Sequence, residues 1–182
     1  MDMINPSEAD SRFDIPLSEI RSELIHEFHR HWLRLCRGSL LPSRSEIDPA
    51  NFKRMLPNVI LVDIEHDPFR VRYRLCGTRV AEFCGKLTGR YLDELEGTDP
   101  WSVAAYIQQY QTAVRECRPV FSHDWLGGKF SVRHKVHSGI WPLAGDGRSV
   151  DMCIAAEDYI SLRRTGAAYG SSDVLATPHP AS

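Results

Sequence analysis

The chain has 182 residues, of which 42% are apolar and 25% charged, a composition typical of a soluble globular protein with one core. Its formal charge of −2 provides no overall attraction to nucleic acid or acidic membranes. Near the amino end the longest apolar run is only a few residues, below the ~18 of a membrane span, and residues 1–16 lack a signal-peptide pattern. The five cysteines form no C-x-x-C pair, which argues against a disulfide framework or a cysteine zinc site. We predict a cytoplasmic protein that binds neither nucleic acid nor membrane.

Apolar residues near the amino end recur at spacings of three and four and predict an amphipathic helix over residues 16–36. They are Leu17, Ile20, Leu24, Phe28, Trp32 and Leu35. Asp48 followed by Pro49 is typical of a helix start, and Pro57 is expected to close that short helix.

Two strands are predicted next, over residues 58–64 and 69–75. The second alternates strictly, with Phe69, Val71, Tyr73 and Leu75 on an apolar face and arginines between them. No aromatic stacking platform accompanies the arginines, so we interpret them as a solvated face rather than a nucleic-acid surface.

Residues 78–95 mix short apolar groups with glycines and predict helical turns and loops. Asp99 and Pro100 predict the start of a longer helix that ends near Cys117. Three further strands are expected at 120–126, 130–141 and 149–156, separated by glycine-rich turns. The predicted organisation is a disordered or extended segment 1–15, one domain over 16–160 that includes an amino-terminal helix 16–37, and a disordered tail 161–182.

This element order predicts an α+β fold, a five-stranded antiparallel sheet with helices on one face plus an amino-terminal helix. Over roughly residues 24–160 the chain resembles a bacterial PAS-like family found mostly in alphaproteobacteria. The resemblance rests on residues 28–32, 41–44, 47–49, 56–58, 73–78, 87–92 and 141–144. It implies a stand-alone sensory or interaction domain whose ligands and partners are largely unassigned, and it implies no catalytic residues.

An aromatic set could converge between the sheet and its helices and form a ligand pocket, or it could fill a dry core. The pocket candidates are Tyr73, Phe83, Tyr106, Tyr110, Phe130, His134 and Trp141. His134 shares the apparent apolar face of its strand with Phe130 and Val136. Some PAS domains bind haem through one histidine, and against that role we weigh an ordinary hydrogen-bonded core histidine.

The remaining histidines of interest are candidates for metal binding or for catalysis. His26, His29 and His31 lie on the predicted helix, but His26 falls opposite the apolar stripe, so we expect solvated or interface histidines and no metal site. His123 and Asp124 are adjacent on a strand and face opposite ways, so the aspartate cannot orient the histidine for catalysis. No nucleophile, zinc or phosphate-binding motif is present, and we predict no catalytic residues.

The stripe of the amino-terminal helix must cover its own sheet or the same helix of a second copy. We predict a homodimer through Leu24, Phe28, Trp32 and Leu35. The predicted function is a non-catalytic PAS-like module that binds a small molecule or a partner protein and signals to a separately encoded protein. The alternatives are a protein–protein scaffold with a filled core, a haem-binding sensor or a small-molecule enzyme.

Overall fold

A computed structural model describes residues 11–38, 40–95, 100–127 and 133–160, with the backbone alone at 100–101, 126–127 and 133–134. Its strands form one five-stranded sheet in the spatial order β2-β1-β5-β4-β3, and every neighbouring pair is antiparallel. The strands are β1 (Val59–His66), β2 (Phe69–Cys76), β3 (Val120–Gly127), β4 (Arg133–Leu143) and β5 (Met152–Tyr159). The predicted α+β fold is confirmed.

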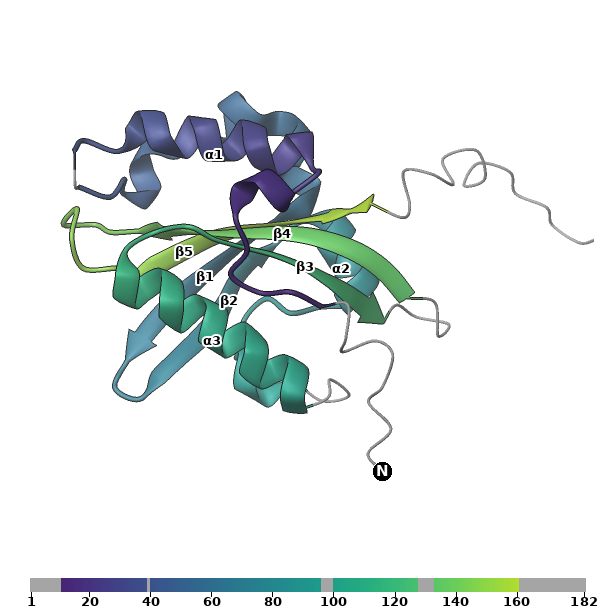
Figure 1. Ribbon diagram of the computed structural model, residues 1–182. Helices are drawn as coiled ribbons and strands as arrows, with labels where there is room; N and C mark the ends of the chain where they lie inside the picture. Colours follow the sequence, from purple (N-terminus) through teal and green to yellow (C-terminus); the bar gives the residue numbers. More distant parts are fainter. Residues whose placement is uncertain (1–10, 39, 96–99, 128–132, 161–182) are drawn as a thin grey trace, which may run out of the picture.

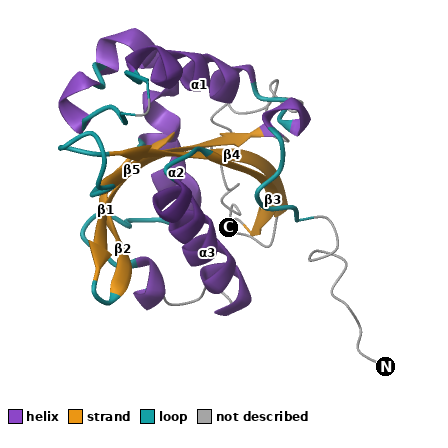
Figure 2. Ribbon diagram, turned by 60° about the vertical axis from the view of Figure 1, so that its left-hand side comes forward, coloured by secondary structure: helices purple, strands orange, loops and turns teal. Residues whose placement is uncertain are grey.

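Helices cover both faces of this sheet (Figures 1 and 2). The α-helices are α1 (Glu23–Leu35), α2 (Thr78–Cys84) and α3 (Pro100–Glu116), and the 3-10 turns are η1 (Leu17–Glu19), η2 (Arg44–Glu46), η3 (Pro49–Asn58) and η4 (Leu92–Glu94). The amino-terminal helix α1 lies above the sheet in Figure 1, and α2 and α3 lie below it. Because both faces are covered, residues 59–62 of β1 are all buried. We call the two sides of the sheet the α1 face and the α3 face.

The amino-terminal helix is shorter than predicted. It starts at Glu23 rather than near residue 16, because the Ser22 hydroxyl accepts the Ile25 N–H and caps the helix there. Leu17 lies in η1, and Ile20 has an extended backbone. Apolar spacing continued through this break, so the sequence pattern did not reveal it.

Other helix predictions are confirmed at their starts. The Asp48 side chain accepts the Ala50 N–H, and α3 begins at Pro100. Glu116 ends α3, and Cys117 then adopts a positive φ of 50°. The helix from Asp48 consists of two 3-10 pieces separated by a kink at Phe52, whose backbone is not helical, and the second piece runs through Pro57 to Asn58. Residues 1–10 and 161–182, for which we predict an extended or disordered start and a disordered tail, lie outside the described residues.

The strand predictions hold with two shifts and one change of face. In β2 the register passes from Leu61↔Leu75 to Val62↔Tyr73, so Arg74 is a bulge that reverses the alternation. Leu75 is therefore 48% exposed instead of buried. The last strand begins at Met152 rather than Ser149, because Asp146 accepts the N–H groups of residues 148 and 149 and holds them in the preceding turn. Arg133 begins β4, and residue 130, where we predicted its start, lies outside the described residues.

Candidate functional site

The α3 face brings two of the predicted pocket residues together. Tyr73 of β2 and Tyr110 of α3 are both buried there, and Val62 pairs with Tyr73 and with Cys153 across the sheet. Burial, followed by the proximity of Tyr73 and Cys153, raises the pKa of Tyr110 well above its usual value. Burial also raises the pKa of the Cys153 thiol. These groups stay neutral at physiological pH, and the thiol is a poor nucleophile.

Tyr106 adds a polar contact to this face. Its hydroxyl donates to Asp124 Oδ2 of β3 at 2.6 Å, and the Asp124 side chain is buried. The backbone N–H of Trp125 and the hydroxyl of Ser11 also donate to the Asp124 carboxylate. Burial and then the negative charge of Asp124 raise the pKa of Tyr106 well above its usual value. The hydroxyl is thus a fixed donor to a buried carboxylate.

A second carboxylate lies on the same face, on β5. Tyr159 donates to Glu157 Oε2 at 2.6 Å, and the Phe83 ring stacks on Tyr159 with a centroid separation of 4.3 Å. Burial raises the pKa of Glu157; the bond from Tyr159 opposes this rise, and the charge of Asp124 adds to it. The interior on this side therefore combines aromatic rings with two carboxylates.

Gln109 is a third polar group on the buried stripe of α3, three residues after Tyr106. Its side chain is only 4% exposed, and its Nε2 has no hydrogen-bond partner among the described residues. A buried amide donor without a partner is costly, on the order of 1–3 kcal/mol. Sequence reasoning missed Gln109, although a polar residue at helical spacing between Tyr106 and Ala113 was a usable signal.

Trp141 does not join the pocket candidates, which corrects the sequence prediction. It is fully buried on the α1 face, with its ring 4.7 Å from Phe28 and 5.8 Å from Phe121, and its Nε1 donates to His29 Nδ1 at 3.2 Å. The sequence does not show which face of β4 each residue lies on, and alternate residues of that strand point to opposite sides of the sheet. Phe130 lies outside the described residues, and for His134 the structure gives only the backbone pairing with Leu126.

The three helix histidines lie in separate environments and do not converge on one site. His26 Nε2 lies 2.7 Å from the Ile20 carbonyl oxygen, while His29 accepts from Trp141. His31 is buried beside Phe28, and burial lowers its pKa. Within the part of the chain that the structure describes, no group of three or more His, Cys, Asp or Glu is placed to hold a metal ion.

Phe28 and Trp32, two of the predicted dimer-interface residues, are instead buried within their own chain. Phe28 packs on Phe52 and Trp141, and Trp32 Nε1 donates to the Pro142 carbonyl at 3.1 Å. Leu24 and Leu35 are half-buried against the same core. The stripe of α1 therefore covers its own sheet, so Phe28 and Trp32 are not free to meet a second copy. Dimerisation itself stays a prediction.

Comparison with known families identifies the class of domain. A family model described as PAS domain matches residues 20–115, just over half of the chain. The chain belongs to the PAS domain family. Domains of this family are generally sensory signalling modules without catalysis of their own. No curated protein matches the sequence.

Several solved structures are similar to the chain at low identity. One is a light-oxygen-voltage domain studied with a flavin analogue, 16% identical with a TM-score of 0.45, covering 63% of this chain and 85% of that chain. The VqmA–ligand–DNA complex of Vibrio cholera is 12% identical with a TM-score of 0.46, covering 72% and 62%. The PAS domain of BvgS from Bordetella pertussis is 18% identical with a TM-score of 0.41, covering 67% and 92%. In the described ranges, none of the helices has the length and apolarity of a membrane span.

Proposed function

We propose that this PAS domain is a sensor that binds a small polar molecule on the α3 face of the sheet. The observation that carries the proposal is the Gln109 amide, which is more than nine-tenths buried and whose Nε2 has no hydrogen-bond partner in the part of the chain that the structure describes. A filled apolar core would contain neither this group nor the carboxylates of Asp124 and Glu157, because burying polar groups costs free energy. A ligand that offers a hydrogen-bond acceptor to Gln109 would remove that cost.

The remaining parts of the proposal concern what the sensor communicates with. We propose a separately encoded signalling protein as the partner and a cytoplasmic location, as the sequence analysis predicts. Binding would act by favouring one packing of α3 on the sheet, which requires different ligand affinities for the two packings. The competing proposal is a scaffold whose core needs no ligand.

Native mass spectrometry of the purified protein, with an absorbance spectrum, tests the ligand. We expect a bound mass on the native chain that is lost, or retained at least tenfold less, in Gln109→Leu. Gln108→Leu is the matched control, because Gln108 is the neighbouring residue on α3 and is exposed. An unoccupied native protein that shows no thermal shift with a panel of small metabolites would contradict the sensor and favour the scaffold. A Soret band would reveal haem.

A further inference from the structure

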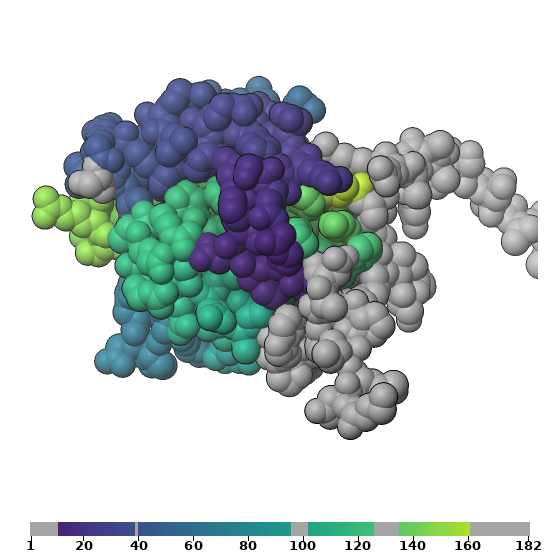
Figure 3. All heavy atoms as spheres, viewed as in Figure 1, coloured from purple at the N-terminus to yellow at the C-terminus, as the bar shows by residue number. Residues whose placement is uncertain are grey.

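The segment of residues 11–22 forms a strap along the free edge of β3. Arg12 and His123 exchange backbone hydrogen bonds of 2.8 and 3.0 Å, and the Ile15 N–H donates to the Phe121 carbonyl at 2.9 Å. In Figure 3 the strap lies across the front of the molecule, between the layer of α1 and the layer of α3. It thus protects the edge of the sheet with only a few backbone bonds.

The first part of the strap contacts the α3 face through Tyr106. Ser11 donates to the same Asp124 carboxylate that accepts the Tyr106 hydroxyl. The Phe13 ring meets the Tyr106 ring edge to face, with a centroid separation of 6.4 Å. A movement of Tyr106 therefore alters both of these contacts at once.

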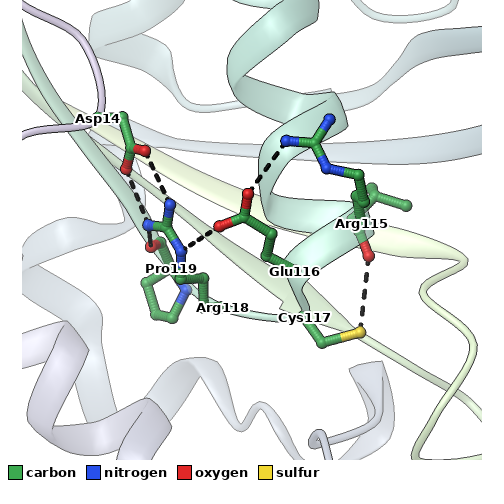
Figure 4. Close-up of polar contacts among 7 residues, drawn as sticks. Asp14, Arg115, Glu116, Cys117, Arg118 and Pro119 are labelled. Atoms are coloured by element: carbon green, nitrogen blue, oxygen red, sulfur yellow. Dashed lines mark hydrogen bonds and ion pairs between the residues drawn. The ribbon is translucent and has the colours of Figure 1, made fainter.

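An ion-pair cluster at the α3–β3 turn holds the middle of the strap (Figure 4). Arg118 donates to both Asp14 oxygens at 2.8 and 2.7 Å and to Glu116 at 2.7 Å. The hydrogen bonds from Arg118 lower the pKa of Asp14; burial opposes this shift, and the charge of Arg118 adds to it. The Asp14 and Arg118 side chains are each more than a third exposed, so solvent screens their charges and the pair contributes little to stability. The ion pair therefore adds little to how firmly the strap is held, and the strap is also anchored by Ile15 and Ile20, which are buried in the core.

The last part of the strap reaches the α1 face. The Arg21 N–H donates to His137 Nδ1 at 2.9 Å, and Ser22 donates to Asp158 at 2.5 Å. Ser22 is also the cap of α1, so the position of the strap sets the start of that helix. One continuous segment thus connects the Tyr106–Asp124 contact to a helix on the opposite side of the sheet.

We propose that the strap is a releasable edge strand that relays the state of the α3 face to α1, with the Tyr106–Asp124 hydrogen bond as its point of control. A ligand that takes the Tyr106 hydroxyl removes one donor from Asp124 and shifts the ring beneath Phe13, which loosens the strap. This use of the relay rests on the proposed sensor function. The coupling itself is a property of the ligand-free chain and can be measured there.

Amide hydrogen exchange by NMR on the ligand-free protein tests the coupling. In Tyr106→Phe we expect exchange at the Arg12, Ile15 and Arg21 amides to accelerate about fivefold to tenfold, as expected for loss of a hydrogen bond to a charged acceptor. The Gly77 amide, which donates to Val59 at the other end of the sheet, is expected to keep its rate. Tyr91→Phe is the matched control, since Tyr91 donates to the Glu65 carboxylate at 2.7 Å on the surface, away from the strap.

Two outcomes would overturn the proposal. One is unchanged exchange at the three strap amides; the other is equal acceleration at the strap and at Gly77, which means that the strap opens only by global unfolding. Should Tyr106→Phe fail to fold, Ser11→Ala provides a second test, because it removes the strap's own bond to Asp124. Unchanged exchange at Arg12 and Arg21 in that variant would equally contradict the relay. If native mass spectrometry shows a bound small molecule but Tyr106→Phe leaves exchange at the strap amides unchanged, the relay is rejected and the sensor proposal stays intact.

Discussion

At the residue scale, the sheet is packed tightly enough on its α1 face to leave no room for a side chain at residue 139. A Cβ built on Gly139 would lie 2.5 Å from Cη2 of Trp141. Trp141 is wedged between Phe28 and Phe121 and cannot move aside freely. The glycine is thus required by the tryptophan two residues later.

Gly139→Ala should destabilise the fold by about 1–3 kcal/mol, because overpacking in a dense core forces side chains from their preferred rotamers. Urea unfolding measures the change. Gly145→Ala is the control, because a Cβ at residue 145 meets only a carboxylate oxygen of Asp151 at 3.1 Å. Equal effects of the two substitutions would show that Trp141 is not the constraint.

His137 makes stability depend on pH. Burial first, and then the nearby charges of His123 and Lys135, lower its pKa to about 4, while Asp158 opposes this shift. Below its ordinary pKa of about 6.5 the unfolded chain binds a proton that the folded chain excludes. The free energy of unfolding therefore has its full value, as far as His137 is concerned, above pH 6.5. It falls by on the order of 2–3 kcal/mol as the pH drops toward 4.

Urea midpoints at pH 7.5, 6 and 5 measure this dependence. In His137→Gln the loss of stability over that range should be smaller than in the native protein, because the remaining slope then comes from other groups such as His29 and His31, whose pKa values burial also lowers. Parallel pH profiles for the two proteins would contradict the assignment.

At the scale of elements, the starts of η3 and α3 were predictable because an aspartate–proline pair is a local signal. The start of α1 was not predictable from periodicity. Ser22 caps that helix and at the same time donates to Asp158, which lies 136 residues further along the chain. The bulge at Arg74 was equally invisible, since it depends on pairing with β1.

Ser22→Ala should destabilise the protein by about 2–3 kcal/mol, since it removes a helix cap and a donor to the buried Asp158 carboxylate. Asp48→Ala is the comparison, because Asp48 caps η3 from an exposed position, and we expect its loss to cost about 1 kcal/mol. Thermal and urea unfolding of both variants measure the difference. A Ser22→Ala cost no larger than that of Asp48→Ala would exclude a structural role for the Asp158 bond.

At the scale of the whole molecule, the sheet is enclosed on both sides, and the apolar stripe of α1 is used within the chain. A homodimer through α1 must therefore use the outward side of the helix. Leu33, which is 51% exposed, lies on that side. The predicted dimer interface thus shifts from Phe28 and Trp32 to the exposed surface.

Sedimentation equilibrium should give twice the chain mass at micromolar concentration for the native protein. We expect Leu33→Glu to reduce this to the mass of one chain, because a charge in an apolar interface is costly to bury. Leu75→Glu, at another exposed leucine, should leave the dimer intact. A single-chain mass for the native protein would reject the dimer.

The sequence by itself determined the elements whose signals are local: the strand-forming runs of β1 and β2, the Pro-started helices and the antiparallel α+β architecture. Only the tertiary structure decided on which face of the sheet each aromatic side chain lies. Trp141 and Tyr110 look alike in the sequence, yet they lie on opposite sides of the sheet. Trp141 faces α1 because successive side chains of β4 alternate between the two faces, whereas Tyr110 belongs to α3, the helix that covers the other face. Contacts such as the one between Ser11 and Asp124 join distant segments of the chain, and no local pattern encodes them.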